Sequence, residues 1–234
     1  MGETECVRAV LFDLDGTLVD SEALTDRAIC EELAARGTPM AALPPEASRG
    51  RTWADIAQAL GARYPAAGEP KELAACLEQR WIEYAEQGIS PIPGAVEALA
   101  EASRVLPLAV VSSSPRAVID SFLTRLGLAH YVAPTARIGA GDAARPKPAP
   151  DGFLLAAARL GASPAACVVF EDSVAGLQAA RAAGMAAVVV LHACAQPDVC
   201  AALAWRAIKD YRALPDRLWA RLAADGVKVL REPW

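Results

Sequence analysis

Paired acidic residues stand at two places in the chain, each directly after an apolar stretch. Asp13 and Asp15 follow one such stretch, and Glu171 and Asp172 follow another. An apolar run that ends in acids and a glycine is typical of a buried strand opening into a loop, so the carboxylates of the first pair can converge on one cavity. Carboxylates near a core are costly unless a positive group meets them, and a hard divalent cation is the natural partner of such oxygens. The pattern favours a bound cation over solvated surface charges.

Two further polar positions could bind an anion. Ser112 follows a third apolar stretch; Ser114, before Pro115, is the better candidate for the N-cap of the next helix, so that Ser112 remains free to bind a ligand. Lys147 stands between two prolines, which we expect to hold the segment extended and to point the ammonium to a defined place. A lysine is more often a surface charge, but the proline brackets make a phosphate partner an equally supported role.

The apolar stretches alternate with helical patterns. This alternation predicts an α/β fold: a Rossmann-like parallel sheet with helices on both faces, whose ligands bind at the carboxyl ends of the strands. The expected strands are 7–13, 105–111, 167–170 and 186–191, and the expected helices between and after them are 115–126, 150–160, 173–183, 198–207 and 214–224.

One segment interrupts this rhythm. Residues 19–91 contain no convincing strand but show helical patterns at 21–36, 53–62 and 71–87, separated by prolines. We expect an inserted α-helical cap domain at 19–91, and an α/β core domain made of residues 1–18 and 92–234.

Composition excludes several classes of protein. The 234 residues carry 28 acids and 23 bases, which gives a net charge of −5 and no footprint for nucleic acid. The N-terminus has no apolar stretch and no run is long enough for a membrane span, so we expect a cytoplasmic protein, as a monomer or homodimer. The six cysteines are expected to be reduced and mostly buried. A metal site formed by His192, Cys194 and Cys200 is the less favoured alternative.

The polar positions stand in a characteristic order along the chain. They are Asp13-x-Asp15-Gly16-Thr17, Ser112, Lys147 and Glu171-Asp172. In this order the chain resembles the haloacid dehalogenase-like superfamily over nearly its whole length. The continuation after Thr17 and the helical insertion resemble the group with an α-helical cap, which includes phosphoglycolate and sugar-phosphate phosphatases and β-phosphoglucomutase.

The resemblance implies a role for each acidic residue. Asp13 would attack phosphorus and become an aspartyl-phosphate, and Asp15 would protonate the leaving alkoxide and later activate water. Mg²⁺ would be held by Asp13, by the backbone carbonyl of Asp15 and by Asp172, with Glu171 close by. Family members that cleave carbon–halogen bonds do not need an acid at the position of Asp15, so the resemblance implies a phosphatase rather than a dehalogenase.

The resemblance also implies how a small phosphorylated metabolite would be bound. Ser112, with Ser113 beside it, and Lys147 would hold the phosphoryl oxygens, while the cap loop Arg49-Gly50-Arg51-Thr52 would read the leaving group. The loop can equally be an ordinary turn with Thr52 as a helix cap.

Two other functions remain open. A β-phosphoglucomutase-like phosphotransferase would use the same nucleophile. The mutase of this type has an arginine after its cap loop, and the nearest matching position here is Trp53, although Arg51 lies close to it in the sequence. A non-catalytic binding protein on the same fold is the third hypothesis.

Overall fold

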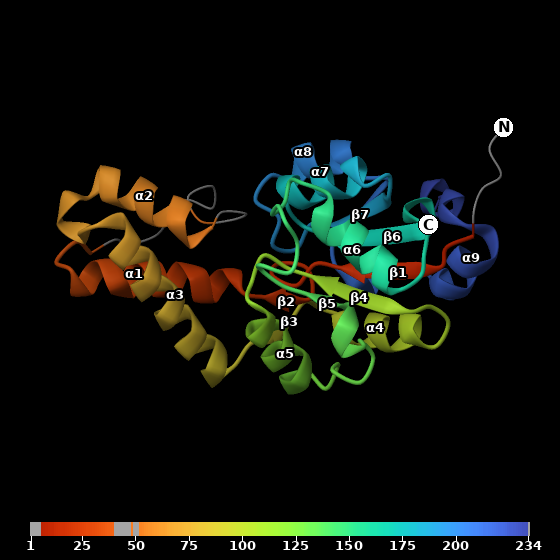
Figure 1. Ribbon diagram of the computed structural model, residues 1–234, viewed down its shortest axis with the longest axis horizontal. Coiled ribbons are helices and arrows are strands. Elements are labelled where there is room, and N and C mark those ends of the chain that lie inside the picture. Colours follow the sequence, from red (N-terminus) through yellow and green to blue (C-terminus); the bar gives the residue numbers. More distant parts are fainter. Residues whose placement is uncertain (1–5, 40–47, 49–51, 234) are drawn as a thin grey trace. The chain divides into compact units, whose positions relative to one another are not determined.

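The computed structural model describes residues 6–39, 48 and 52–233. The chain forms two compact units (Figure 1). One unit combines Met1–Val19 with Pro91–Trp234, and the other consists of Asp20–Ser90. The predicted cap loop lies mostly outside the described residues, which exclude Arg49, Gly50 and Arg51.

The first unit is built on a parallel sheet. In the part of the chain that the structure describes, six strands pair in the order β5-β4-β1-β6-β7-β8. The central strands are in register, with Phe12 of β1 opposite both Val110 of β4 and Phe170 of β6. The strands are β1 (Ala9–Phe12), β4 (Leu108–Val111), β5 (Arg137–Ile138), β6 (Cys167–Glu171), β7 (Ala186–Val190) and β8 (Arg206–Ile208).

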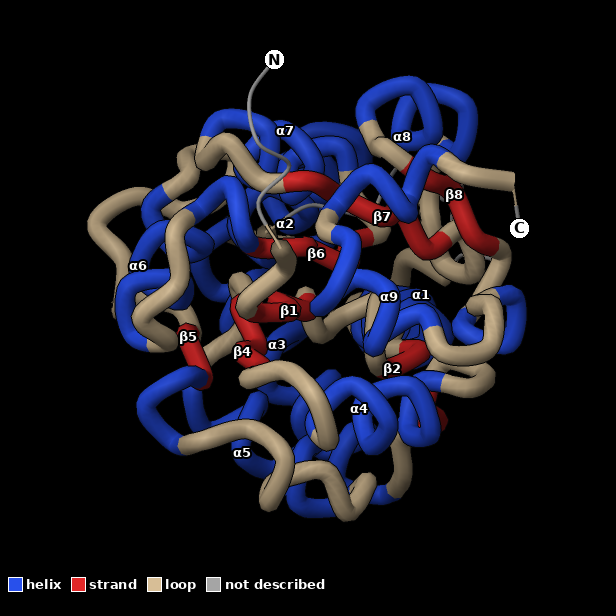
Figure 2. Tube along the Cα trace, turned by 90° about the vertical axis from the view of Figure 1, so that its right-hand side faces the viewer, coloured by secondary structure: helices blue, strands red, loops and turns tan. Residues whose placement is uncertain are grey.

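Helices cover both faces of this sheet. Viewed nearly along the sheet, α6 and α7 lie on one side of it and α4 and α9 on the other (Figure 2). The helices of this unit are α4 (Ala95–Ser103), α5 (Arg116–Arg125), α6 (Asp151–Arg159), α7 (Val174–Ala182), α8 (Pro197–Leu203) and α9 (Leu218–Asp225). Short 3₁₀ helices lie at Pro134–Ala136, Pro164–Ala166, Tyr211–Ala213 and Val227–Arg231. The predicted α/β class is therefore confirmed.

An aromatic cluster supports the ends of the two central strands. Phe12 and Phe170 stack with ring centroids 5.1 Å apart, and Tyr211 and Trp219 pack against both rings. The central strands are buried on both faces, as expected for apolar runs in a parallel sheet. Because these rings come directly before the acids, packing of the C-terminal segment against them fixes the positions from which those acids project.

The second unit is helical. It contains α1 (Glu22–Ala35), α2 (Trp53–Arg63), a 3₁₀ turn at Pro65–Ala67 and α3 (Pro70–Gln87). Its core joins apolar side chains of all three helices, among them Ile29, Ile56 and Leu77. Trp53 packs edge-on against Trp81, with ring centroids 6.3 Å apart.

Several short elements differ from the sequence prediction. The segment predicted to lack strands is bordered by a two-residue pair, β2 (Val19–Asp20) with β3 (Ser90–Pro91). The helix expected at 198–207 ends at Leu203, and the chain then forms edge strand β8. Strands of two or three residues are too short to show a period in the sequence.

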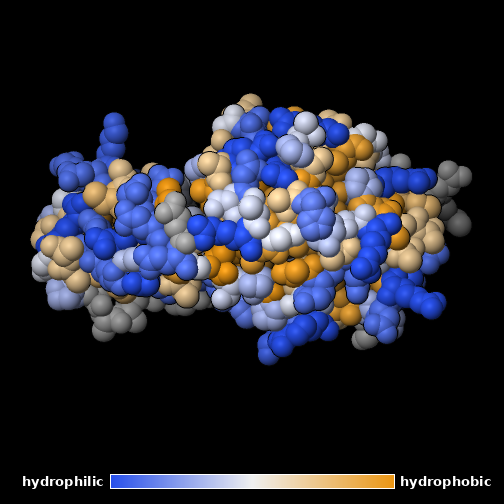
Figure 3. Space-filling model, turned by 90° about the horizontal axis from the view of Figure 1, so that it is seen from below, coloured by the Kyte–Doolittle hydropathy of each residue, from blue (hydrophilic) through white to orange (hydrophobic). Residues whose placement is uncertain are grey.

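None of the helices described is long and apolar enough to cross a bilayer. Hydrophilic and hydrophobic residues are intermixed over the face shown in Figure 3.

Candidate active site

The loop after β1 carries the first pair of acids. Asp13 is 6% exposed, and its amide donates to the carbonyl of Phe170 at 2.9 Å, which ties the loop to β6. The chain then turns tightly, with the amides of Leu18 and Val19 both donating to the carbonyl of Leu14. Gly16 has a φ of +76°, and a Cβ there would lie 2.3 Å from Asp172 Oδ2. Glycine is required here both by the backbone and by the approach of the second acidic loop.

Lys147 joins the two acidic loops. Its Nζ donates to Asp13 Oδ1 at 2.5 Å, to Glu171 Oε1 at 2.6 Å and to the carbonyl of Val111 at 3.0 Å. The prediction that its prolines hold the segment extended is wrong: the chain turns here, and the amide of Ala149 donates to the carbonyl of Pro146. The turn nevertheless brings the ammonium to one fixed position between two carboxylates.

The second acidic loop is organised around Glu171. This side chain is 1% exposed, and its Oε2 accepts hydrogen bonds from the amides of Asp172 and Ser173 and from the Ser173 hydroxyl. Its other oxygen faces Lys147. Asp172 accepts a hydrogen bond from Thr17 at 3.2 Å. Both oxygens of Glu171 are thus occupied by protein donors, which suits an organising residue more than a direct metal ligand.

Asp15 contacts two serines that follow β4. Its Oδ2 accepts from the hydroxyls of Ser112 at 3.1 Å and Ser114 at 2.7 Å. The prediction that Ser114 caps the next helix is wrong, because α5 has Pro115 at its N-cap and no side-chain cap there. A serine before proline resembles a cap locally, and nothing in the neighbouring sequence reveals a partner 99 residues away.

Two other predicted positions are Ser113, which follows Ser112, and Thr52, which belongs to the helical unit. Ser113 is exposed, and no polar contact within the described residues joins it to these acids. Thr52 caps α2 by accepting from the amide of Asp55, the simpler of the two roles considered for it.

The cysteines do not form a metal centre. No disulfide joins any of the six, all of which are among the described residues, and three of them (Cys167, Cys194 and Cys200) are buried. Within residues 6–39, 48 and 52–233, no three His, Cys, Asp or Glu side chains cluster as a ready-made metal cage. The alternative site at His192, Cys194 and Cys200 is therefore not supported.

Burial and charge act in opposition on the Asp13–Lys147 pair. Burial raises the pKa of Asp13, and the Lys147 ammonium opposes that rise. Burial alone would lower the pKa of Lys147, but the carboxylates of Asp13 and Glu171 raise it above its ordinary value. The lysine is therefore charged at neutral pH and supplies the positive charge that the buried carboxylates need.

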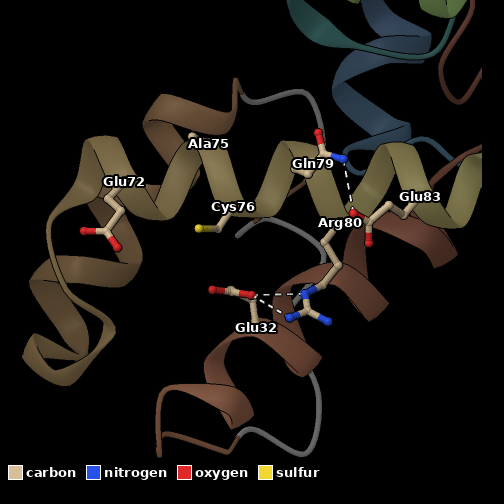
Figure 4. Close-up of a pocket in the computed structure, with 7 residues that line it drawn as sticks. All are labelled: Glu32, Glu72, Ala75, Cys76, Gln79, Arg80 and Glu83. Carbon is tan, nitrogen blue, oxygen red and sulfur yellow. Dashed lines mark hydrogen bonds and ion pairs between the residues drawn. The ribbon is translucent and has the colours of Figure 1, made fainter.

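The helical unit has a pocket of its own. It measures about 390 Å³ and lies between α1 and α3 (Figure 4). Glu32, which is 7% exposed, lines it and binds Arg36 at 2.8 Å and Arg80 at 2.8 Å. Burial raises the pKa of Glu32, but hydrogen bonds from both arginines outweigh this and lower it overall.

We expect Glu32→Gln to weaken the contact between α1 and α3 by about 1–3 kcal/mol, because two guanidinium groups lose their shared charge. Since the pKa of Glu32 is lowered by folding, this stabilisation is present at neutral pH and is lost as the pH falls through that lowered value. Hydrogen exchange of the α1 and α3 amides in the full chain measures it. Glu83→Gln, on the exposed rim of the same pocket, is the matched control and should change exchange little. Equal protection in both variants would contradict this assignment.

Comparison with known proteins agrees with this geometry. A family model described as haloacid dehalogenase-like hydrolase matches residues 7–184. The chain is 37% identical to the fructose-1-phosphate phosphatase YqaB of Escherichia coli, over 77% of this chain and 95% of that protein. It is 30% identical to the phosphoglycolate phosphatase of Escherichia coli, over 85% and 90%. The crystal structure of CbbY from Rhodobacter sphaeroides in complex with phosphate superimposes with a TM-score of 0.73 and 26% identity, over 89% and 96%.

Proposed function

The chain belongs to the haloacid dehalogenase-like hydrolase family, and we propose that it is a Mg²⁺-dependent phosphatase of small phosphomonoesters. The observation that carries the proposal is the contact of Lys147 with Asp13 at 2.5 Å, at the end of the central strand. A buried carboxylate held by a fixed ammonium can act as a nucleophile toward an anion that the same ammonium attracts. Asp15, Ser112 and Asp172 belong to the same unit, where Asp15 accepts a hydrogen bond from Ser112 and Asp172 accepts one from Thr17.

In this proposal the two aspartates after β1 divide the chemistry. Asp13 attacks phosphorus, the bond to the leaving oxygen breaks, and an aspartyl-phosphate forms. Asp15 gives its proton to the departing alkoxide and then takes a proton from the water that hydrolyses the intermediate. Lys147 and Ser112 hold phosphoryl oxygens, so that positioning and charge neutralisation supply most of the catalysis.

The donor set fits a magnesium ion. Asp13 and Asp172 end neighbouring paired strands, and Mg²⁺ is commonly bound by one or two carboxylates plus water and substrate phosphate rather than by an all-protein cage. Asp13 and Glu171 already share the ammonium of Lys147, and Asp15 and Asp172 add further negative charge nearby in the sequence, so a dianionic phosphate needs added positive charge to approach. Asp13, Asp172 and the carbonyl of Asp15 would hold the ion, which offsets charge on the phosphoryl group when bound. Glu171 would orient Lys147 and the Asp172 loop.

The substrate class is a sugar phosphate or phosphoglycolate. Relatives named for these activities align over three quarters or more of this chain. The helical unit Asp20–Ser90 would act as the cap, with the loop at Arg49-Gly50-Arg51 contacting the leaving group. The proposed setting is the cytoplasm.

Phosphate release from fructose 1-phosphate, 2-phosphoglycolate and glycerol 3-phosphate tests the proposal. We expect turnover with Mg²⁺ and at least about 100-fold less after removal of divalent ions with EDTA, restored by excess Mg²⁺. Turnover that is indifferent to EDTA would contradict the metal dependence. An absence of phosphate release from every compound would contradict the phosphatase.

A β-phosphoglucomutase activity is the alternative. It would convert β-glucose 1-phosphate to glucose 6-phosphate with little free phosphate, and we expect phosphate release to dominate instead. Isomerisation that outpaces release would replace the phosphatase by the mutase.

A further inference from the structure

The backbone of Ser114 is fixed by hydrogen bonds of both its amide and its carbonyl. Its amide donates to Ser112 Oγ at 2.9 Å, and its carbonyl accepts from the amide of Ala140 at 2.9 Å, in the loop after β5. A Cβ on Gly139 would lie 3.0 Å from that carbonyl, so glycine permits the close approach of the two loops. From this fixed backbone the Ser114 hydroxyl donates a hydrogen bond to Asp15 Oδ2 at 2.7 Å.

Ser112 contacts the same carboxylate oxygen but has only one proton to give. In the structure that proton is directed to Asp15 at 3.1 Å, while the oxygen accepts from the Ser114 amide. Under the proposed function Ser112 donates to a phosphoryl oxygen when substrate is bound. Ser112 then no longer donates to Asp15, and the Ser114 hydroxyl continues to donate to Asp15 Oδ2.

We propose that Ser114 is a positioning residue that orients Asp15 for proton transfer during turnover. In this proposal Oδ2 accepts from Ser114 and the proton that Asp15 delivers lies on Oδ1, so one hydrogen bond sets which carboxylate oxygen acts as the acid. This inference rests on the proposed function and adds to it a residue that the local sequence presents as a helix cap.

The test compares substrates whose leaving groups differ in their need for a proton. An alkoxide needs a proton to depart, whereas 4-nitrophenolate and the acetate of acetyl phosphate depart as stable anions. The ratio kcat/KM includes the steps up to aspartyl-phosphate formation and excludes its hydrolysis, which is common to all substrates. For Ser114→Ala we expect kcat/KM to fall about 10-fold or more with fructose 1-phosphate or 2-phosphoglycolate, whichever the wild type uses faster. With 4-nitrophenyl phosphate or acetyl phosphate it should fall less than about 3-fold.

The Ser114→Thr variant tests whether the effect comes from the hydroxyl group or from the size of the side chain. It keeps the donor and should restore kcat/KM for the alkyl phosphate to within about 3-fold of the wild type. The melting temperatures of all three proteins should agree, because the side chain is only half-buried.

Different outcomes overturn different claims. An equal loss with both classes of substrate, or a loss confined to KM, would mean that Ser114 binds substrate and does not position Asp15. No loss with the alkyl phosphate would also overturn the inference while leaving the phosphatase intact. A wild type that releases no phosphate would instead overturn the proposed function itself, and this inference with it.

Discussion

Asp13→Asn is expected to lower kcat by at least about 10⁴-fold with every substrate, because the amide has no nucleophilic oxygen to offer phosphorus. The substitution is nearly isosteric, and the asparagine carbonyl can still accept the hydrogen bond from Lys147. Phosphate release in the presence of saturating Mg²⁺ measures the loss.

The fold should survive this change. Asp13 is a buried carboxylate whose pKa is raised by burial, so its ionised form opposes folding at neutral pH. Lys147 keeps Glu171 as a partner at 2.6 Å. We therefore expect an unchanged or higher melting temperature, with Asp225→Asn on the exposed end of α9 as a control that alters neither activity nor stability. Full turnover in Asp13→Asn would refute Asp13 as nucleophile.

Gly176→Ala is expected to damage both stability and activity. Gly176 lies in α7, where alanine would ordinarily be preferred by about 1 kcal/mol. A Cβ at this position, however, would lie 1.7 Å from Glu171 Oε1. Hydrogen bonds from Lys147 to Oε1 and from the Asp172 amide to Oε2 fix that carboxylate in place. The carboxylate must move, and it then loses Lys147 and the two loop amides together.

We expect at least about 3 kcal/mol less stability, because a buried ion pair is broken, and about 100-fold lower kcat/KM, because Asp172 and Lys147 shift. Urea denaturation and phosphate release measure the two effects. Gly61→Ala in α2 is the matched control: its Cβ would meet nothing nearer than 3.4 Å, so it should be neutral or stabilising. If Gly176→Ala behaved like that control, Glu171 would not organise the site.

The positions of the acids could be predicted because parallel strands end at one edge of a sheet. Asp13, Ser112 and Glu171 each follow an apolar run that is legible in the sequence, and the structure places these runs on the paired strands β1, β4 and β6. β1 and β4 are shorter than predicted, since they begin at Ala9 and Leu108, whereas β6 extends one residue further, to Glu171. The catalytic roles of these residues remain proposals.

The contacts that local sequence patterns did not predict join residues that are far apart along the chain. Ser114 reaches Asp15 across 99 residues, and Lys147 reaches Asp13 across 134. Local rules assigned the serine to a helix cap and the lysine segment to an extended conformation, because they weigh only the neighbouring prolines. Edge strand β5 escaped notice for a related reason: two residues carry no periodic signal.

The most direct test of the central claim is to trap the phosphorylated enzyme. Asp15→Asn should form the aspartyl-phosphate and hydrolyse it slowly, so that an acid quench with acetyl phosphate and Mg²⁺ captures it. Mass spectrometry of the proteolysed protein should find one phosphoryl group on Asp13, and none in the Asp13→Asn, Asp15→Asn double variant. A phosphoryl group on another residue, or wild-type turnover without any phosphorylated enzyme at millisecond quench times, would contradict the account.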